Sequence, residues 1–203
     1  MARRRWLGVL LLAAACGHEP ASERPPPAPP SAELPAPRSL DEACARWKCR
    51  PSTTVRVQIP KSSPRGWHEI TVARSPYSDG KLVRILPGEK LAITGDLRGD
   101  QLVNLRLAEG PAADGRDVLL LEFAERPIGA EPSMVFEVHN RFARTVKYHA
   151  SMQLPERKGF FSTSTCAVLA GKATYEMWPH PIFSLLLREF QFLDEGKSVS
   201  CEK

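Results

Sequence analysis

The sequence has few of the residue types and patterns that identify an enzyme. Its 203 residues include only five cysteines, five histidines, four tryptophans and three tyrosines. It contains no Gly-x-Ser-x-Gly nucleophile turn, no His-Glu-x-x-His zinc helix and no phosphate-binding glycine loop. Nothing in these patterns indicates nucleophilic, metal-dependent or nucleotide-dependent catalysis, and we expect no cofactor.

Long hydrophobic runs are also missing. The clearest apolar stretch, Trp6 to Ala15, is far shorter than the roughly 20 helical residues that cross a bilayer. It follows three arginines at positions 3 to 5 and precedes Cys16. A basic start, a short apolar stretch and small residues before a cleavage point are typical of an export signal, so residues 1–15 are predicted to be a signal peptide.

The order of these residues resembles the lipobox of bacterial lipoproteins, in which the cysteine is lipidated and becomes the first mature residue. Here the cysteine is Cys16, and the family's usual leucine three positions earlier is replaced by Ala13. The same alanines also fit an ordinary secretory cleavage site, which would release a secreted protein with Cys16 unmodified. Lipidation would leave four cysteines for pairing, so the cysteine count favours the lipid. Gly17 after the cysteine implies, by the resemblance, anchoring to the outer membrane.

Proline and alanine dominate the segment that follows, residues 16–39. Proline fixes φ and lacks a backbone donor, so this segment should remain near polyproline II. At about 3.1 Å per residue it could hold a domain up to about 70 Å from the membrane. We interpret it as a lipid-anchored linker; the alternative is a proline-rich ligand for a partner domain.

Without the predicted signal peptide, the chain has no large excess of basic or acidic residues. The net charge of +5 includes the three arginines of the signal peptide, and without them 25 basic residues face 23 acidic ones. The remaining basic residues are scattered and are not interleaved with aromatic residues. We therefore expect no binding to nucleic acid.

Residues 40–203 have the length of one domain, and their pattern is that of strands. Ser39 and Glu42 form a capping box for a short helix from about Leu40 to Lys48. Beyond it, apolar residues alternate with polar ones, and turn residues separate the runs. The apolar sets are Val55, Val57 and Ile59; Ile70 and Val72; Val103, Leu105 and Leu107; Met134, Phe136 and Val138; and Val146, Tyr148, Ala150 and Met152. This predicts an all-β fold, a β-sandwich of the immunoglobulin-like or a related kind.

The stretch 181–193 fits two structures. Ile182, Leu186 and Phe190 belong to a set with helical spacing, whereas Leu185, Leu187, Phe190 and Phe192 fit a strand with a one-residue bulge. Phenylalanine and isoleucine favour strands and the surroundings are β, so we predict the strand.

Four cysteines remain for disulfides: Cys44, Cys49, Cys166 and Cys201. Three connectivities are possible, and we favour Cys44 with Cys49 and Cys166 with Cys201. A regular helix holds residues five apart too far from each other for a disulfide, so the first pair requires the helix to unwind at residues 46 to 48.

Candidate binding residues are few. Glu137, His139 and His149 would approach one another if residues 134–152 formed a hairpin, and they are the best metal candidates, although Lys147 between them would repel a cation. We therefore predict no metal site.

Two surface segments could contact a partner. Arg141, Arg144 and Lys147 form a basic rim that could meet lipid phosphates or an anionic glycan, or simply protect a strand edge. Tyr175 and Trp178 form an aromatic segment of the kind found in interfaces and sugar sites, but also in cores.

These patterns predict a non-enzymatic lipoprotein of the cell envelope that binds an envelope protein or glycan. The membrane contact would be the N-terminal lipid. The alternative is a secreted or anchored hydrolase whose site carries no recognisable motif.

Overall fold

The structure is a computed structural model that describes residues 36–58, 66–129, 131–194 and 201. The predicted signal peptide, Cys16 and the linker up to residue 35 lie outside the described residues. The elements, in chain order, are α1 (Leu40–Arg46), β1 (Cys49–Arg50), β2 (Thr53–Gln58), β3 (Trp67–Val72), β4 (Ser75–Pro76), β5 (Leu82–Ile85), β6 (Glu89–Arg98), β7 (Gln101–Leu107), the 3₁₀ turn η1 (Gly110–Asp114), β8 (Leu119–Ile128), β9 (Glu131–Asn140), β10 (Thr145–Gln153), β11 (Phe161–Thr163), β12 (Ala173–Trp178) and β13 (Ser184–Leu193).

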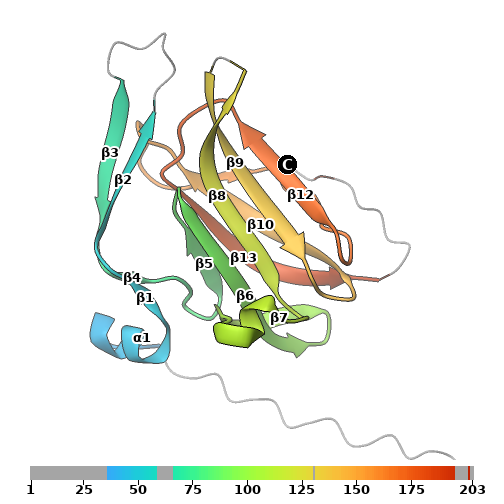
Figure 1. The fold of residues 1–203 in the computed structure, drawn as a ribbon. Helices are drawn as coiled ribbons and strands as arrows, with labels where there is room; N and C mark the ends of the chain where they lie inside the picture. Colours follow the sequence, from blue (N-terminus) through green and yellow to red (C-terminus); the bar gives the residue numbers. More distant parts are fainter. Residues whose placement is uncertain (1–35, 59–65, 130, 195–200, 202–203) are drawn as a thin grey trace, which may run out of the picture. The chain divides into compact units, whose positions relative to one another are not determined.

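One large antiparallel sheet forms most of the fold. Its strand order is β11-β10-β13-β7-β6-β8-β9-β12, and β5 also pairs with β13. The sheet curls, so that β6, β8, β9 and β12 form one layer while β5, β10 and β13 lie behind them (Figure 1). Two small sheets, β1 with β4 and β2 with β3, precede it. The predicted all-β, sandwich-like fold with a short N-terminal helix is confirmed.

The core lies between the two layers, and aromatic rings join them. The Phe136 ring on β9 meets the Phe123 ring on β8 edge to face, with centroids 6.2 Å apart. It meets the Tyr148 ring of β10 in the opposite layer at 6.3 Å. Such edge-to-face pairs add to the burial of apolar area. Because β9 and β10 carry their apolar faces toward each other, alternation predicts both strands correctly.

The predicted hairpin over residues 134–152 is wrong. β9 pairs with β8 and β12, whereas β10 pairs with β11 and β13. The buried Asn140 explains the crossing, because its side-chain amide donates to the carbonyl oxygens of Arg144 and Val168, at 2.8 and 2.9 Å. These bonds support a wide turn that takes the chain from one layer to the other.

The N-terminal helix begins as predicted and ends two residues early. The Ser39 hydroxyl accepts the Glu42 N–H at 3.1 Å, but the Glu42 carboxylate accepts the N–H of Arg38 rather than that of Ser39. The helix ends at Arg46, and Trp47 is extended. This unwinding allows the Cys44–Cys49 disulfide, and Cys166 is bonded to Cys201. Both predicted pairings are confirmed.

The stretch after residue 181 is a strand, as predicted, and it carries the bulge. Leu185, Leu187, Phe190 and Phe192 are all buried. The register with β10 slips between Lys147 and His149, opposite Glu189, whose φ is 56°. The extra residue lets the apolar set continue on the core side after the slip.

Glu176 on β12 is a half-buried carboxyl that faces the interior side of its strand. It accepts the N–H of Cys166 at 2.9 Å, yet burial raises its pKa. The folded protein therefore holds this proton more tightly than the unfolded chain. The free energy of unfolding therefore falls as the pH rises from the Glu176 pKa of the unfolded chain through the higher Glu176 pKa of the folded protein.

We expect Glu176→Gln to be more stable than the parent at neutral pH and equally stable in acid, because the amide oxygen still accepts the Cys166 N–H and no charge is buried. Melting temperatures from acid to neutral pH measure this. Glu122→Gln is the matched control. Ion pairing with Lys90 and Arg126 lowers the Glu122 pKa, so this variant should be less stable than the parent at neutral pH. If the melting temperature of the parent instead rose relative to that of Glu176→Gln as the pH increased, the raised pKa of Glu176 would be contradicted.

Candidate functional site

The outward side chains of β6, β8, β9 and β12, called the outer face here, form rows across the strands. Register places Lys90, Glu122, Glu137 and Tyr175 side by side in one polar row. The neighbouring row holds Ala92, Leu120, His139 and Ala173. On the other side lie Ala124, Val135 and Met177. The outer face thus carries a polar row between two mainly apolar ones.

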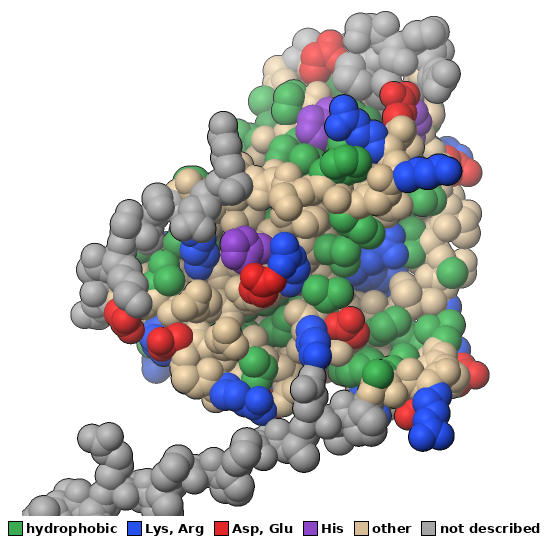
Figure 2. All heavy atoms as spheres, turned by 180° about the vertical axis from the view of Figure 1, so that it is seen from behind, with side chains coloured by type: hydrophobic (Ala, Val, Ile, Leu, Met, Phe, Trp, Pro, Cys, Tyr) green, Lys and Arg blue, Asp and Glu red, His purple; other side chains and the backbone are tan. Residues whose placement is uncertain are grey.

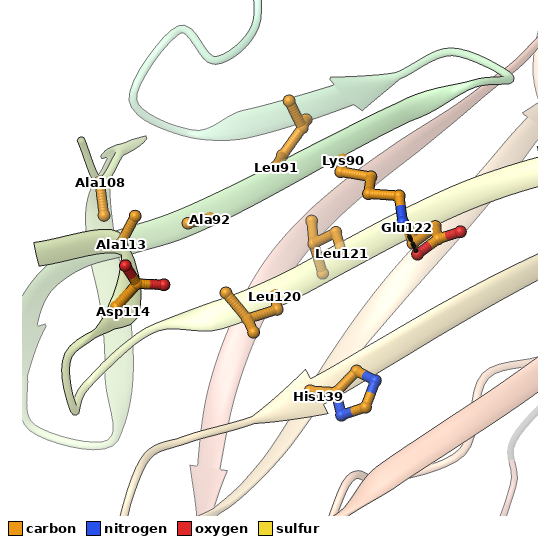
Figure 3. A pocket seen from close by; sticks show the side chains of 10 residues that line it. All are labelled: Lys90, Leu91, Ala92, Ala108, Ala113, Asp114, Leu120, Leu121, Glu122 and His139. Carbon is orange, nitrogen blue, oxygen red and sulfur yellow. Dashed lines mark ion pairs between the residues drawn. The ribbon is translucent and has the colours of Figure 1, made fainter. Parts of the chain in front are cut away.

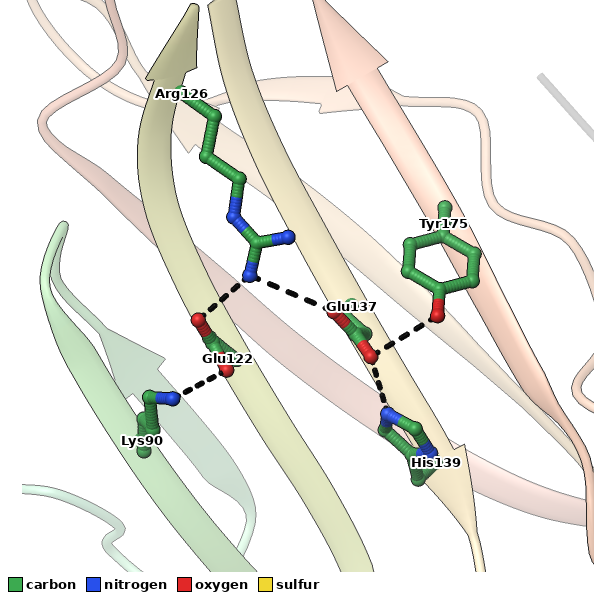
Figure 4. Close-up of polar contacts among 6 residues, drawn as sticks. All are labelled: Lys90, Glu122, Arg126, Glu137, His139 and Tyr175. Atoms are coloured by element: carbon green, nitrogen blue, oxygen red, sulfur yellow. Dashed lines mark hydrogen bonds and ion pairs between the residues drawn. The ribbon is translucent and has the colours of Figure 1, made fainter.

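The polar row, with Arg126 of β8 and His139 of β9 added to it, is a continuous chain of contacts (Figure 4). Lys90 Nζ lies 2.8 Å from one Glu122 oxygen, and Arg126 Nη2 lies 2.6 Å from the other. The same Arg126 nitrogen is 3.6 Å from Glu137. The remaining Glu137 oxygen accepts the Tyr175 hydroxyl at 3.1 Å and contacts His139 Nε2.

The cations of this row compensate two carboxylates that lie directly opposite each other. Like charges at such positions repel, and Glu137 is only 13% exposed. Lys90 and Arg126 lower the pKa of Glu122, and Glu122 raises the pKa of Arg126. The hydrogen bond to Glu137 raises the pKa of the Tyr175 hydroxyl. Every group drawn in Figure 4 therefore has a partner within this set of contacts.

A shallow hollow of about 400 Å³ lies beside the polar row, between the strands and η1. Ala92 and Leu120 line its floor, and Ala108 and Ala113 line the wall formed by the η1 segment (Figure 3). Asp114, Lys90, Glu122 and His139 supply the polar part of its lining. The small side chains of Ala92, Ala108 and Ala113 leave the space that forms the hollow.

The two aromatic residues predicted from the sequence play different roles. Tyr175 is 56% exposed and belongs to the outer face, where the neighbouring Met177 is 60% exposed. Trp178 is only 8% exposed, packs in the core cluster and donates its indole N–H to Thr163 of β11 at 3.0 Å. The prediction that Trp178 contributes to a surface site is wrong, because its position on β12 points to the interior.

The predicted basic rim is largely engaged within the protein. Arg144 lies 2.7 Å from Asp100 and 3.6 Å from Asp194, and its guanidinium covers the Phe192 ring. Arg141 donates to the carbonyl oxygen of Asp114 at 2.8 Å. Lys147 also has an interaction partner. These contacts favour a structural role for the rim over an anion-binding role.

The weak metal candidates do not come together. Glu137 and His139 are in contact on β9, but His149 lies on β10 in the other layer, 3.6 Å from Glu189. Within the described residues, no group of three or more histidine, cysteine or acidic side chains could hold a metal ion. The wrong hairpin explains why sequence reasoning placed the three together.

The opposite side of the molecule carries charged side chains of both signs. Figure 2 shows basic and acidic side chains scattered among small apolar areas, with no broad region of one sign among the side chains drawn in colour. The described part of the chain also contains no helix long and apolar enough to span a membrane. The outer face carries the hollow, the polar row and the exposed Tyr175 and Met177.

The lining of the hollow limits its chemistry. It contains no serine, threonine or cysteine that could act as a nucleophile. The carboxylates of the polar row are ion-paired, and the Glu122 pKa is lowered, which does not suit a general acid. This arrangement suits binding better than covalent catalysis.

Sequence reasoning missed Lys90, Leu120, Glu122 and Arg126, which form the centre of the outer face. The only signal was the alternation of Glu122, Ala124 and Arg126 with buried Leu121 and Phe123. Comparison of the chain with protein-family models, with curated proteins and with solved structures gives no match.

Proposed function

We propose that this protein is an exported, lipid-anchored module of the cell envelope that binds another envelope component through its outer face, without catalysis. The observation that carries the binding role is the internally neutralised polar row between two mainly apolar rows, with Tyr175 and Met177 exposed and a hollow beside it. When a partner covers this face, its charges keep their internal counter-charges, so no unpaired charge is buried, and the apolar contacts must offset the cost of desolvating the pairs.

Two features support export and anchoring. Two disulfides occur in the described residues, and disulfides persist in oxidising compartments. The N-terminal sixteen residues resemble a lipoprotein signal that ends at Cys16. The proline-rich linker would then separate the folded residues from the membrane and leave the outer face accessible to a partner.

The composition of the outer face favours an envelope protein as partner over a glycan. Ala92, Ala124 and Ala173 carry no large side chain, so the face can meet another flat surface closely. Tyr175 and Met177 stand on the edge strand β12 as exposed anchors. Tyrosine and methionine are enriched in protein interfaces.

Photo-cross-linking in intact envelopes tests the binding face. With the full protein carrying benzoylphenylalanine at position 120 or 177, we expect the same adduct from both positions. The control position is 149, on the outward side of β10 in the other layer. Ala124→Arg should abolish the adduct, and Ser151→Arg, the matched change on β10, should leave it intact. Adducts from position 149 alone, or adducts that survive Ala124→Arg, would refute the proposed face.

Fractionation tests the anchor. The parent should remain in the membrane fraction after a high-salt wash, whereas Cys16→Ser should be lost from it, because acyl chains rather than ion pairs would hold the protein. Release of the parent by salt alone would contradict lipid anchoring.

A hydrolase is the second candidate, because Glu137 contacts His139 at the edge of the hollow. A carboxylate that orients a histidine is part of many general-base sites. If this pair activates water, His139→Gln should abolish hydrolysis of an envelope substrate. Under the binding proposal the parent itself shows no hydrolysis, and His139→Gln can change only partner capture, because His139 belongs to the outer face.

A further inference from the structure

β12 is an edge strand of the large sheet (Figure 1). Among the described residues it pairs with β9 alone, so one side of its backbone has no partner strand. The strand at the other end of the sheet order, β11, is three residues long, whereas β12 has six. β12 therefore offers the longer of these two edges to a further strand.

The hydrogen bonds of the ladder identify which backbone groups of β12 point to the free side. The Asn140 N–H donates to the Lys172 carbonyl oxygen at 2.9 Å, so these two residues form a hydrogen-bonded pair. In an antiparallel ladder such pairs recur at every second residue. The even-numbered residues of β12 therefore bond to β9, and the odd-numbered ones direct their N–H and C=O groups away from it. The odd-numbered residues are Ala173, Tyr175 and Met177.

The free side of β12 is exposed and lacks the usual protection of an edge. The side chains of its odd-numbered residues are all exposed, that of Tyr175 to 56% and that of Met177 to 60%. Natural edge strands are commonly protected by lysine, proline or a bulge. β12 contains no lysine or proline, and its register with β9 does not shift. Its one charged residue, Glu176, accepts the Cys166 N–H on the interior side. An accessible edge of this kind is where a further strand adds to a sheet.

The residues of β12 fit an antiparallel copy of the same strand. With Tyr175 opposite Tyr175 of the other copy, Ala173 lies opposite Met177, and all odd-numbered residues of both strands are paired. On the outward side, each large Met177 then lies beside a small Ala173, and the two Tyr175 rings form an aromatic cross-strand pair. On the interior side, Glu176 lies opposite the uncharged Thr174. A shift that placed Glu176 opposite itself would set two carboxylates together and leave an odd-numbered residue of each copy unpaired.

We propose that two copies of this protein associate through β12, with the strands antiparallel and Tyr175 at the two-fold axis. This inference does not rest on the proposed partner binding. A single strand of six residues is a small contact compared with the roughly 1,600 Å² of a standard interface, so the dimer should dissociate on dilution. A lipid anchor would favour it by concentrating the copies on one membrane. A cross-link between two copies has twice the mass of the chain, which distinguishes it from an adduct with another envelope protein.

Charge exchange across the two-fold axis tests the register. Ala173→Lys/Met177→Lys sets like charges opposite each other and should sediment as a monomer, as should Ala173→Glu/Met177→Glu. An equimolar mixture of these two variants should dimerise, because every lysine then lies opposite a glutamate. Thr54→Lys/Gln58→Lys, the matched control with the same spacing at exposed positions of β2, should dimerise like the parent. A mixture that stays monomeric, or a lysine variant that dimerises like the parent, would refute this pairing.

Amide hydrogen exchange tests the edge without altering it. The exported protein carrying Cys16→Ser lacks the lipid and keeps both disulfides, and NMR follows its exchange from micromolar to millimolar concentration. Exchange at the Tyr175 and Met177 amides should slow by about tenfold or more as the dimer forms, whereas the Asn140 amide, bonded inside the sheet, should stay slow throughout. Fast exchange of the two edge amides at every concentration would overturn the proposal. Slow exchange at every concentration would also overturn it, because another segment of the same chain would then cover the edge.

Discussion

Replacing Trp178 with alanine is expected to lower the free energy of unfolding by about 3–5 kcal/mol, the usual cost of removing a large buried aromatic side chain. Trp178 packs in the core, and its indole N–H bonds to Thr163. It therefore links β12 and β11, the two edge strands of the curled sheet. Urea unfolding followed by circular dichroism measures the change.

Tyr175→Ala is the matched control on the same strand. Its side chain is exposed and makes one hydrogen bond to Glu137, so its removal should cost less than about 1 kcal/mol. Under the binding proposal it should instead weaken partner capture. Trp178→Phe should restore most of the lost stability, because it refills the volume and loses only the hydrogen bond. Equal costs for Trp178→Ala and Tyr175→Ala would show that Trp178 is not part of the core.

The double variant Cys166→Ala/Cys201→Ala is expected to lose about 3–4 kcal/mol of stability, whereas Cys44→Ala/Cys49→Ala should lose about 2 kcal/mol. The first disulfide joins residues 35 apart and the second joins residues 5 apart. A longer closed loop removes more conformational freedom from the unfolded chain. The 35-residue loop contains β12 and β13, so this bond restrains an edge strand and a central strand together.

Unfolding midpoints of the two double variants, compared with the parent under non-reducing conditions, test this ranking. The parent under reducing conditions should lose the sum of the two effects. A larger cost for the short loop than for the long one would contradict the loop-length account.

Strands with one buried and one exposed face were predictable from the sequence. β2 shows Val55 and Val57 between exposed residues, and β10 shows Val146, Tyr148 and Ala150 in the same way. Their alternation follows from the pleat, in which successive side chains point to opposite faces. The bulged strand near residue 190 and the Cys44–Cys49 disulfide were predictable for similarly local reasons, and the Cys166–Cys201 pair joined the two cysteines that remained.

β8 shows why the outer face was not predicted. Its Leu119, Leu120 and Leu121 are all apolar, although only the first and third are buried. Because the residues on both faces of this part of β8 are apolar, the sequence does not show which of them are buried. The polar row needs, in addition, the register among β6, β8, β9 and β12, and their pairing joins residues far apart in the chain.

The hairpin error has the same origin. β9 and β10 follow each other with a short connection, and neighbours in sequence usually pair. Here the bonds of Asn140 carry the chain across the core, so the residues on these strands lie in different layers. Both strands were predicted correctly, but their pairing was not. The wrong pairing brought Glu137, His139 and His149 together as metal candidates, and in the structure His149 lies apart from the other two.

The mass of the mature N-terminal peptide, isolated from the membranes of the native host, tests the central claim most directly. An exported, lipid-anchored protein predicts a peptide that begins at Cys16 and carries the added mass of acyl chains on that residue. A peptide that begins at Cys16 without added mass, or one that still contains the arginines at positions 3 to 5, would contradict it.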